Sequence, residues 1–452
     1  MSVDLQSYLS AKKGLNNYSD ILRNIQEYMS NTYDNLLSVD MSDSDEKLVK
    51  EYIKQYIVTH SIKLDDFDDD ELTNQLFSDM AEFSFLTKFL RNPEKMHLEE
   101  IDINSWEDID LIVNGQRYKS PEHFLSPQHA IDIVRRMLQM SGNVIDDSNP
   151  TALGSLAKNI RITVLKTPVL DDDIGIAASI RVVTKTFLSK STLSQNTATA
   201  GMLDFLAMAV KYGISVCIAG NTGSGKTSTA SWLMSSLPDS TRIYTIEEGS
   251  REFDLIKRGK NGVVLNSVIH TLTKSSLDKS TEITQEDLLD FALRFNPDVI
   301  CVGEMRSREA FAAQEAARTG HTVITTIHSK TAAGAYMRMT TLAKRAYEFS
   351  DDTLMKMMVE AFPIIVFQRQ LEDASRKITE IIEGEDYING VLKYRVLFRY
   401  VVDDNSSGSD GKVSVKGHFE RGDVISERLR SEFIQNGAPK VIADLLDRKS
   451  VV

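Results

Sequence analysis

The residues best suited to chemistry form the motif GNTGSGKT at positions 220–227, which fits the phosphate-loop pattern of Gly, four residues and Gly-Lys-Ser/Thr. An apolar run of strand length precedes the motif at 214–220, and a helical pattern that stops at Pro238 follows it. Its glycines permit backbone angles at which consecutive N–H groups face one anion, and the following helix adds the positive end of its dipole. The motif therefore predicts a triphosphate site.

Individual positions of this loop have expected parts in binding ATP and Mg²⁺. Lys226 supplies a full positive charge for the β- and γ-phosphates, and the Thr227 hydroxyl is an expected Mg²⁺ ligand. A glycine-rich turn that binds nothing is the alternative, which the Lys-Thr pair and the flanking patterns disfavour. The predicted nucleotide-binding residues are Gly220, Asn221, Thr222, Gly223, Ser224, Gly225, Lys226, Thr227 and Ser228.

Hydrolysis of a bound triphosphate also needs a group that positions or activates water. Glu304 follows an apolar strand pattern at 298–303 and should lie on the same sheet edge as Lys226. We therefore expect Glu304 to act as the base and as a Mg²⁺ ligand. Glu247 ends an earlier strand pattern and is the expected second acid. The alternative for each glutamate is an exposed carboxylate at a strand end.

Two histidines flank the next strand pattern, which covers residues 322–327. We expect His321 and His328 to bind phosphate or to relay its state, although a single histidine more often has a structural part.

Strand and helix patterns alternate through the region around the phosphate loop, which predicts an α/β fold with a parallel sheet and ligands at its carboxyl edge. The segments 189–196 and 403–411 are polar, and we expect a linker and an exposed loop there. A run at 263–269 is strand-like. The predicted domains are a helical N-terminal region at 1–95, an α+β domain at 96–190, and an ATPase domain at 191–452 with a C-terminal helical and β-hairpin extension.

Two strand patterns of the α+β domain, at 160–165 and 176–183, each place one arginine among apolar neighbours. From spacing alone, Arg161 and Arg181 are equally well explained as strand residues that face solvent.

Composition limits the classes of partner. The net charge of −13 disfavours direct binding of nucleic acid or anionic lipid, which needs a basic surface. Cys217 and Cys301 lie in apolar strand patterns and are expected to be buried rather than to form a disulfide or a metal site. No apolar run approaches the roughly 20 residues of a membrane span, and the start MSVDLQSYLS lacks the pattern of a signal peptide. We expect a reduced intracellular protein that meets a membrane only through partners.

Four motifs in order resemble those of the secretion and pilus-assembly ATPases that power type II and type IV secretion and type IV pili. After GNTGSGKT, the segment TIEEGSREFDL at 245–255 resembles the acidic box. PDVICVGEMRSREA at 297–310 resembles the second nucleotide motif, and TGHTVITTIHSKTA at 319–332 resembles the histidine box. The resemblance covers about residues 95–450 and is greatest to the branch that serves tight-adherence pili and conjugation-type machines.

This chain departs from the family pattern at a few positions. The acidic box reads Glu-Glu-Gly-Ser, Arg181 is followed by two valines where basic residues are usual, and Lys330 stands where asparagine is common. None of these changes removes a group that is expected to touch phosphate. They leave open the subfamily, and so the kind of secretion or pilus machine, to which the chain belongs.

The resemblance implies a RecA-like P-loop core in which Glu247 and Glu304 hold the catalytic positions. It also implies that Arg161 and Arg181 reach the nucleotide between the α+β domain and this core. A hexameric ring is implied, which is cytoplasmic and associates peripherally with the inner face of the membrane through an integral-membrane platform protein. Such a ring converts ATP hydrolysis into work on a membrane complex.

Two functions from other classes stay open at this stage. One is a nucleotide-gated assembly scaffold with little turnover, against which the complete set of acidic residues argues. The other is a conjugative nucleic-acid translocation ATPase, which the acidic net charge disfavours. The motifs are common to machines for pilus assembly, protein secretion and conjugation.

Overall fold

The structure is a computed structural model. It describes residues 18–33, 43–64, 67–91, 93–157, 160–182, 189–249, 251–274, 280–407 and 413–440. Contacts divide the chain into two compact units, Met1–Lys185 (unit 1) and Thr186–Val452 (unit 2). Within the described ranges, no helix is both long enough and apolar enough to cross a bilayer.

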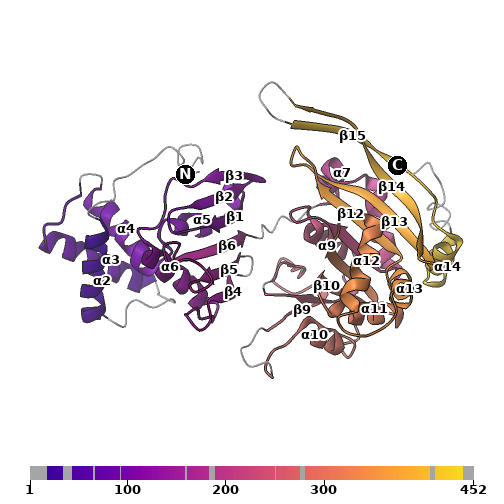
Figure 1. The fold of residues 1–452 in the computed structure, drawn as a ribbon, viewed down its shortest axis with the longest axis horizontal. Coiled ribbons are helices and arrows are strands. Elements are labelled where there is room, and N and C mark those ends of the chain that lie inside the picture. The colour runs from indigo at the N-terminus through magenta and orange to yellow at the C-terminus, as the bar shows by residue number, and fades with distance from the viewer. Residues whose placement is uncertain are drawn as a thin grey trace. The chain divides into compact units, whose positions relative to one another are not determined.

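Unit 1 contains three helices with a hydrophobic core of their own (Figure 1). These helices are α2 (Tyr18–Tyr33), α3 (Asp43–Thr59) and α4 (Asp69–Ala81). Apolar side chains spaced by three or four residues, such as Leu22, Ile25 and Met29, are buried between them. The Asp68 side chain accepts the N–H groups of Asp70 and Glu71 and so caps α4. The acidic residues Asp68 to Glu71 thus form the start of α4.

The rest of unit 1 is an antiparallel six-stranded sheet in the order β3-β2-β1-β6-β5-β4, with helix α6 packed against it. Its strands are β1 (Leu98–Ile103), β2 (Ile109–Val113), β3 (Gln116–Lys119), β4 (Thr151–Ala157), β5 (Ile160–Lys166) and β6 (Ile176–Val182), and its helices are η1 (Ser84–Leu86), α5 (Thr87–Arg91), η2 (Pro93–Met96) and α6 (Pro127–Met140). The turn Asn114–Gly115 has positive φ at both residues and joins β2 to β3 in a hairpin. The division of unit 1 at residue 95 stays a prediction.

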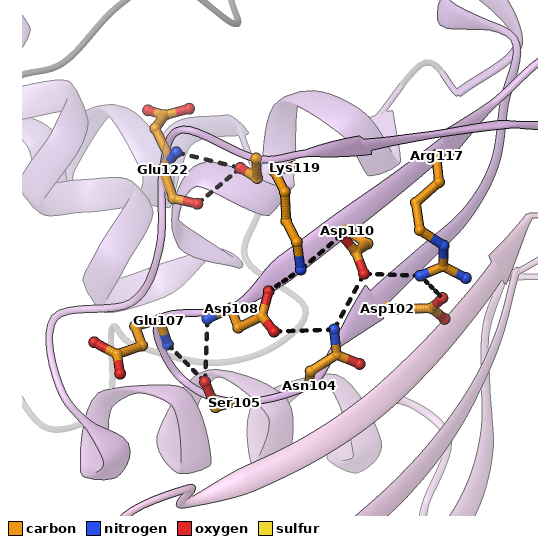
Figure 2. A network of polar contacts seen from close by, with 10 residues as sticks. Asp102, Asn104, Ser105, Glu107, Asp108, Asp110, Arg117, Lys119 and Glu122 are labelled. Carbon is orange, nitrogen blue, oxygen red and sulfur yellow. Dashed lines mark hydrogen bonds and ion pairs between the residues drawn. The ribbon is translucent and has the colours of Figure 1, made fainter.

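A polar network ties the first three strands together around the buried carboxylate of Asp110 on β2 (Figure 2). Arg117 on β3 contacts Asp110 at 2.8 Å and Asp102 at 2.9 Å, while Lys119 contacts Asp110 at 3.0 Å. The Asn104 amide donates to the same carboxylate at 3.1 Å. Burial alone would raise the pKa of Asp110, but the bonds from Lys119, Arg117 and Asn104 outweigh burial and lower that pKa.

We expect Asp110→Asn to lower the free energy of unfolding by about 2 kcal/mol, because hydrogen bonds to a charged group are lost. A lowered carboxyl pKa gives stability that is complete above the ordinary Asp range, near about pH 4, and is lost as the pH falls below it. Urea unfolding at neutral pH and at about pH 3 measures both effects. The difference between wild type and variant should shrink at the lower pH, and exposed Asp172→Asn is the control. An equal difference at both pH values would contradict this account.

Unit 2 is built on a nine-stranded sheet in the order β15-β14-β13-β12-β7-β11-β10-β8-β9. The six strands from β12 to β9 in that order are parallel, and the other three are antiparallel. The strands are β7 (Val216–Gly220), β8 (Arg242–Glu247), β9 (Ser267–Leu272), β10 (Val299–Met305), β11 (Thr322–His328), β12 (Ile364–Gln370), β13 (Arg376–Ile388), β14 (Val391–Ser407) and β15 (Val413–Arg421). This confirms the predicted α/β class, with a parallel core in which the phosphate loop follows β7.

Helices cover both faces of this sheet (Figure 1). They are α7 (Lys190–Asn196), α8 (Ala200–Lys211), α9 (Lys226–Ser235), α10 (Gln285–Ala292), α11 (Glu309–Arg318), α12 (Ala332–Ala343), α13 (Asp351–Ala361) and α14 (Glu427–Gln435). Alternate residues of β7 enter the two cores: Val216 and Ile218 pack with α8 and α9, whereas Cys217 and Ala219 pack with α10 to α13. Both cysteines are buried and free, as predicted.

Several local predictions were wrong. Residues 190–196 form helix α7 rather than a linker, because the Ser189 side chain caps the helix and Leu193 is buried. The predicted loop at 403–411 begins as strand, since β14 pairs with β15 as far as Ser407; the remainder of that loop, 408–411, lies outside the described ranges. Strand β9 begins at Ser267, so most of the predicted strand at 263–269 is irregular.

Candidate functional site

The phosphate loop connects the carboxyl end of β7 to the start of α9, as the motif predicts. Gly225 stands just before the helix with φ of +90°, in the left-handed region that favours glycine. At Gly220 the constraint is space, because an added Cβ would lie 2.1 Å from the backbone oxygen of Gln368 on β12. Both positions therefore exclude a side chain, and the loop lies close to the neighbouring strand.

Lys226 is buried, and its ammonium group donates to the backbone oxygens of Gly220 at 3.2 Å and Asn221 at 2.9 Å. Its positive charge is therefore held within the loop, beside the N-terminus of α9. Ser224 is fully buried and donates to the same Asn221 oxygen at 2.8 Å. Of the remaining loop residues, Thr227 is partly buried, whereas Asn221, Thr222, Gly223 and Ser228 are exposed.

Parallel pairing brings the predicted acidic residues to the same sheet edge as the loop. His328 at the end of β11 is in register with Gly220, and Glu304 stands near the end of the adjacent strand β10. The Nε2 atom of His328 lies 3.1 Å from Glu304 Oε1. Glu247 ends β8, which pairs with β10 on its other side. The structure thus assembles three of the predicted catalytic side chains at one edge.

The carboxylate of Glu304 is held between two cationic or polar partners. Besides His328, Arg306 contacts its Oε2 atom at 2.7 Å and also reaches Glu248 at 3.1 Å. Burial alone would raise the pKa of Glu304, but the hydrogen bonds from His328 and Arg306 lower that pKa to about 2. A carboxylate with so low a pKa is a weak proton acceptor in this state. Its charge is suited to orienting water or holding a cation.

Glu247 is almost fully buried, and its Oε1 atom accepts the backbone N–H groups of Glu252 and, at 2.9 Å, of Phe253. Its carboxylate therefore fixes the path of the acidic box after β8. Strands β8 and β10 approach closely here, since an added Cβ at Gly303 would lie 3.2 Å from the Ile246 backbone oxygen. Ser250 of the acidic box lies outside the described ranges.

The other predicted residues are not at this edge of unit 2. His321 precedes β11 and therefore lies at the amino end of the strand, opposite His328. Arg161 and Arg181 are in unit 1, where they are cross-strand partners on β5 and β6. Both side chains are partly exposed, and Arg181 lies 3.7 Å from Glu100 on β1.

Residues that the sequence did not single out also belong to the site. Arg306 directly follows the last residue of β10, two positions after Glu304, so nearness in sequence is the signal that could have found it. Glu248 directly follows the last residue of β8, and its contact with Arg306 places it at the site. Arg376 donates its Nε–H to the Gly223 carbonyl at 2.8 Å across 153 positions of sequence, and no local pattern signals that contact.

The residues present fit a magnesium nucleotide. The described part of the chain contains no group of three or more His, Cys, Asp or Glu side chains that could hold a metal by themselves. Mg²⁺ with a nucleotide needs only one or two protein ligands, because phosphate oxygens and water fill its other positions. Thr227 in the first turn of α9 and the ionised Glu304 provide suitable oxygen atoms at this edge.

We expect Glu304→Gln to bind ATP with unchanged affinity and to lose ATP turnover by about 100-fold or more, because the charge that orients water is removed while the shape is kept. A phosphate-release assay beside a nucleotide-binding titration measures both quantities. Glu427→Gln, at a side chain that is 89% exposed, is the matched control. Turnover in Glu304→Gln equal to that of the control would contradict the assignment.

The sequence of this chain is similar to secretion-system proteins. The family model for type II/IV secretion system proteins matches residues 90–414. An uncharacterized protein of Methanocaldococcus jannaschii is 26% identical over 71% of this chain and 58% of its own length, so the chain spans well under two thirds of that relative. The type IV secretion system protein VirB11 of Bartonella quintana is 29% identical over 57% of this chain and 80% of its own length.

Among solved structures, the Legionella pneumophila ATPase DotB is 20% identical, with a TM-score of 0.48, and the match covers 81% of this chain and 88% of that chain.

Proposed function

The chain belongs to the type II/IV secretion system protein family, and we propose that it is an ATP-hydrolysing motor of a secretion or pilus-assembly machine. The observation that carries the proposal is the meeting of the phosphate loop with Glu304 and His328 at one edge of a parallel sheet. A nucleotide-binding loop alone would serve a scaffold as well as an enzyme. The charged carboxylate beside that loop is what hydrolysis additionally needs.

Each residue has a defined part in the proposed reaction. The phosphate loop and Lys226 bind the β- and γ-phosphates, and Thr227 would hold Mg²⁺, which neutralises phosphate charge when bound. Glu304 orients the attacking water, and His328 keeps the Glu304 carboxylate in place. Glu247 holds the acidic box in shape through its backbone hydrogen bonds. We do not assign His321 to the reaction, because it lies at the opposite end of β11.

We propose in addition that Arg161 and Arg181 supply positive charge to the nucleotide during turnover. Their cross-strand pairing presents two guanidinium groups together on one small sheet, and guanidinium is suited to phosphate oxygens. The support for the contact itself is the family resemblance of the four motifs. Closure of the α+β domain on the core would then follow the state of the nucleotide.

We propose that the working form is a cytoplasmic hexameric ring that meets an integral-membrane platform protein at the inner face of the membrane. The type IV secretion relatives support a secretion machine, and the tight-adherence branch is the finer assignment from the sequence. A nucleotide-gated scaffold and a nucleic-acid translocase are the competing outcomes. The first would bind ATP without turnover, and the second would show turnover that DNA strongly stimulates.

Lys226→Ala should abolish ATP binding, because the buried ammonium group of the loop is lost. A fluorescent nucleotide titration measures this, with circular dichroism to establish that the variant is folded. Lys356→Ala, at an exposed lysine on α13, is the control and should bind as wild type does. Wild-type affinity in a folded Lys226→Ala variant would refute the phosphate-loop assignment.

Arg161→Ala and Arg181→Ala should each reduce ATP turnover by about 10-fold or more, because charge that develops on the phosphates loses a partner. Steady-state phosphate release measures this, and Arg135→Ala on α6 is the control from the same unit. If both variants turn over ATP at the wild-type rate, the two arginines have no part in the reaction and the closure model fails.

A further inference from the structure

The segment that joins β12 to β13 lies against the phosphate loop. Arg376, the first residue of β13, donates its Nε–H to the Gly223 carbonyl at 2.8 Å. Its Cδ atom is 3.4 Å from the position that a Cβ at Gly225 would occupy. The aliphatic part of the arginine thus packs on one glycine of the loop while its guanidinium group bonds to another.

Gln368 on β12 supports the same loop from the adjacent strand. Its side chain is buried, and its Oε1 atom accepts the Thr229 hydroxyl of α9 at 2.8 Å. Its Nε2 atom is 2.9 Å from the position of a Cβ at Gly225, and its backbone oxygen faces Gly220. The loop is therefore enclosed on this side by β12 and by the start of β13.

The turn between these strands is anchored on its other side to β15. Asp373 accepts the Val415 N–H at 3.2 Å and the Ser375 N–H at 3.0 Å. The neighbouring Glu372 accepts the Asn405 amide of β14 at 3.2 Å. The turn that carries Arg376 is thus held between the phosphate loop and the β14–β15 hairpin.

The hydrogen bond from Arg376 to the Gly223 carbonyl also affects the direction of the N–H group that follows it in the same peptide. The carbonyl and the N–H of one planar trans peptide point in opposite directions, so a restraint on the first orients the second. The N–H in question belongs to Ser224, which makes only a long contact of 3.4 Å with the Asn221 oxygen. This N–H lies in the loop whose donors would bind phosphate.

We propose that Arg376 is a positioning residue that orients the Gly223–Ser224 peptide for the phosphates of the nucleotide, and that Asp373 anchors the turn that carries it. The inference rests on the proposed function, because it assumes that the loop binds a nucleotide. It adds to that site two residues from outside the four sequence motifs. It also connects the site to the β14–β15 hairpin through the Val415 N–H.

The test is the affinity of the full-length chain for a fluorescent methylanthraniloyl derivative of ADP. Arg376→Ala should raise the Kd about tenfold, since a charge-assisted hydrogen bond that orients the loop is lost. Arg376→Lys should recover only part of this, because lysine keeps the charge but not the planar Nε–H donor. Asp373→Ala should raise the Kd by a smaller factor, about threefold, because Asp373 acts on the loop only through the turn that carries Arg376.

The control is Arg369→Ala, which removes an exposed arginine of β12 on the strand face opposite to Gln368 and should leave the Kd unchanged. In steady-state assays, Arg376→Ala should raise KM for ATP with kcat within about twofold, the pattern of lost ground-state binding. A merely structural arginine would instead lower the urea midpoint and leave the Kd of the folded fraction unchanged.

The outcomes separate this inference from the proposed function. If wild type binds the ADP derivative and Arg376→Ala binds it equally well, the positioning role is wrong while the motor proposal stands. Wild-type affinity in Asp373→Ala would show that the contact of Asp373 with β15 does not contribute to nucleotide binding. If wild type itself fails to bind the derivative, the proposed function fails and takes this inference with it.

Discussion

The site depends on the parallel register of β10, β11 and β7. Gly220 faces His328 across one pair of strands, and Val302 faces Thr325 across the other, so the strand ends that carry chemistry finish together. A slip of one residue would turn every side chain of a strand to the opposite face. Because the strands are apolar and buried on both faces, such a slip would also take residues from both hydrophobic cores. The same strand register is therefore required by the packing of the sheet and by the geometry of the site.

At this sheet edge, carboxylates and a guanidinium group lie within ion-pair distance of one another. Glu304 and Glu248 are two carboxylates near one another, and Arg306 contacts both. Together with His328, it keeps Glu304 ionised although that side chain is largely buried. The acidic group of the site is thus charged before a nucleotide arrives. The hydrogen bonds from Arg306 and His328 outweigh the effect of burial on the pKa of Glu304, so the carboxylate is ionised at neutral pH.

Much of this could be predicted from the sequence because the decisive signals are local. The phosphate loop, its flanking strand and helix, and the strand-end positions of Glu304 and Glu247 all follow from spacing within short segments. His321 and His328 look equivalent in sequence, and only the direction of β11 separates them. Helix α7 was missed because its polar composition resembles a linker, whereas its cap and one buried leucine decide the structure.

The contacts that could not be predicted join segments far apart in the chain. Gln368 and Arg376 reach the phosphate loop from strands that begin more than a hundred residues later, and their position depends on β12 pairing with β7. Neither residue stands in a recognisable motif. A contact between distant segments does not change the pattern of apolar and polar residues in either segment, so it is seen only in the structure.

The central claim is that this arrangement hydrolyses ATP rather than merely binding it. The most direct measurement is phosphate release from ATP by the purified full-length chain with Mg²⁺, followed over many equivalents of enzyme. The account predicts sustained release well beyond one phosphate per chain. Tight nucleotide binding with release that never exceeds the uncatalysed background would contradict it and would indicate a scaffold.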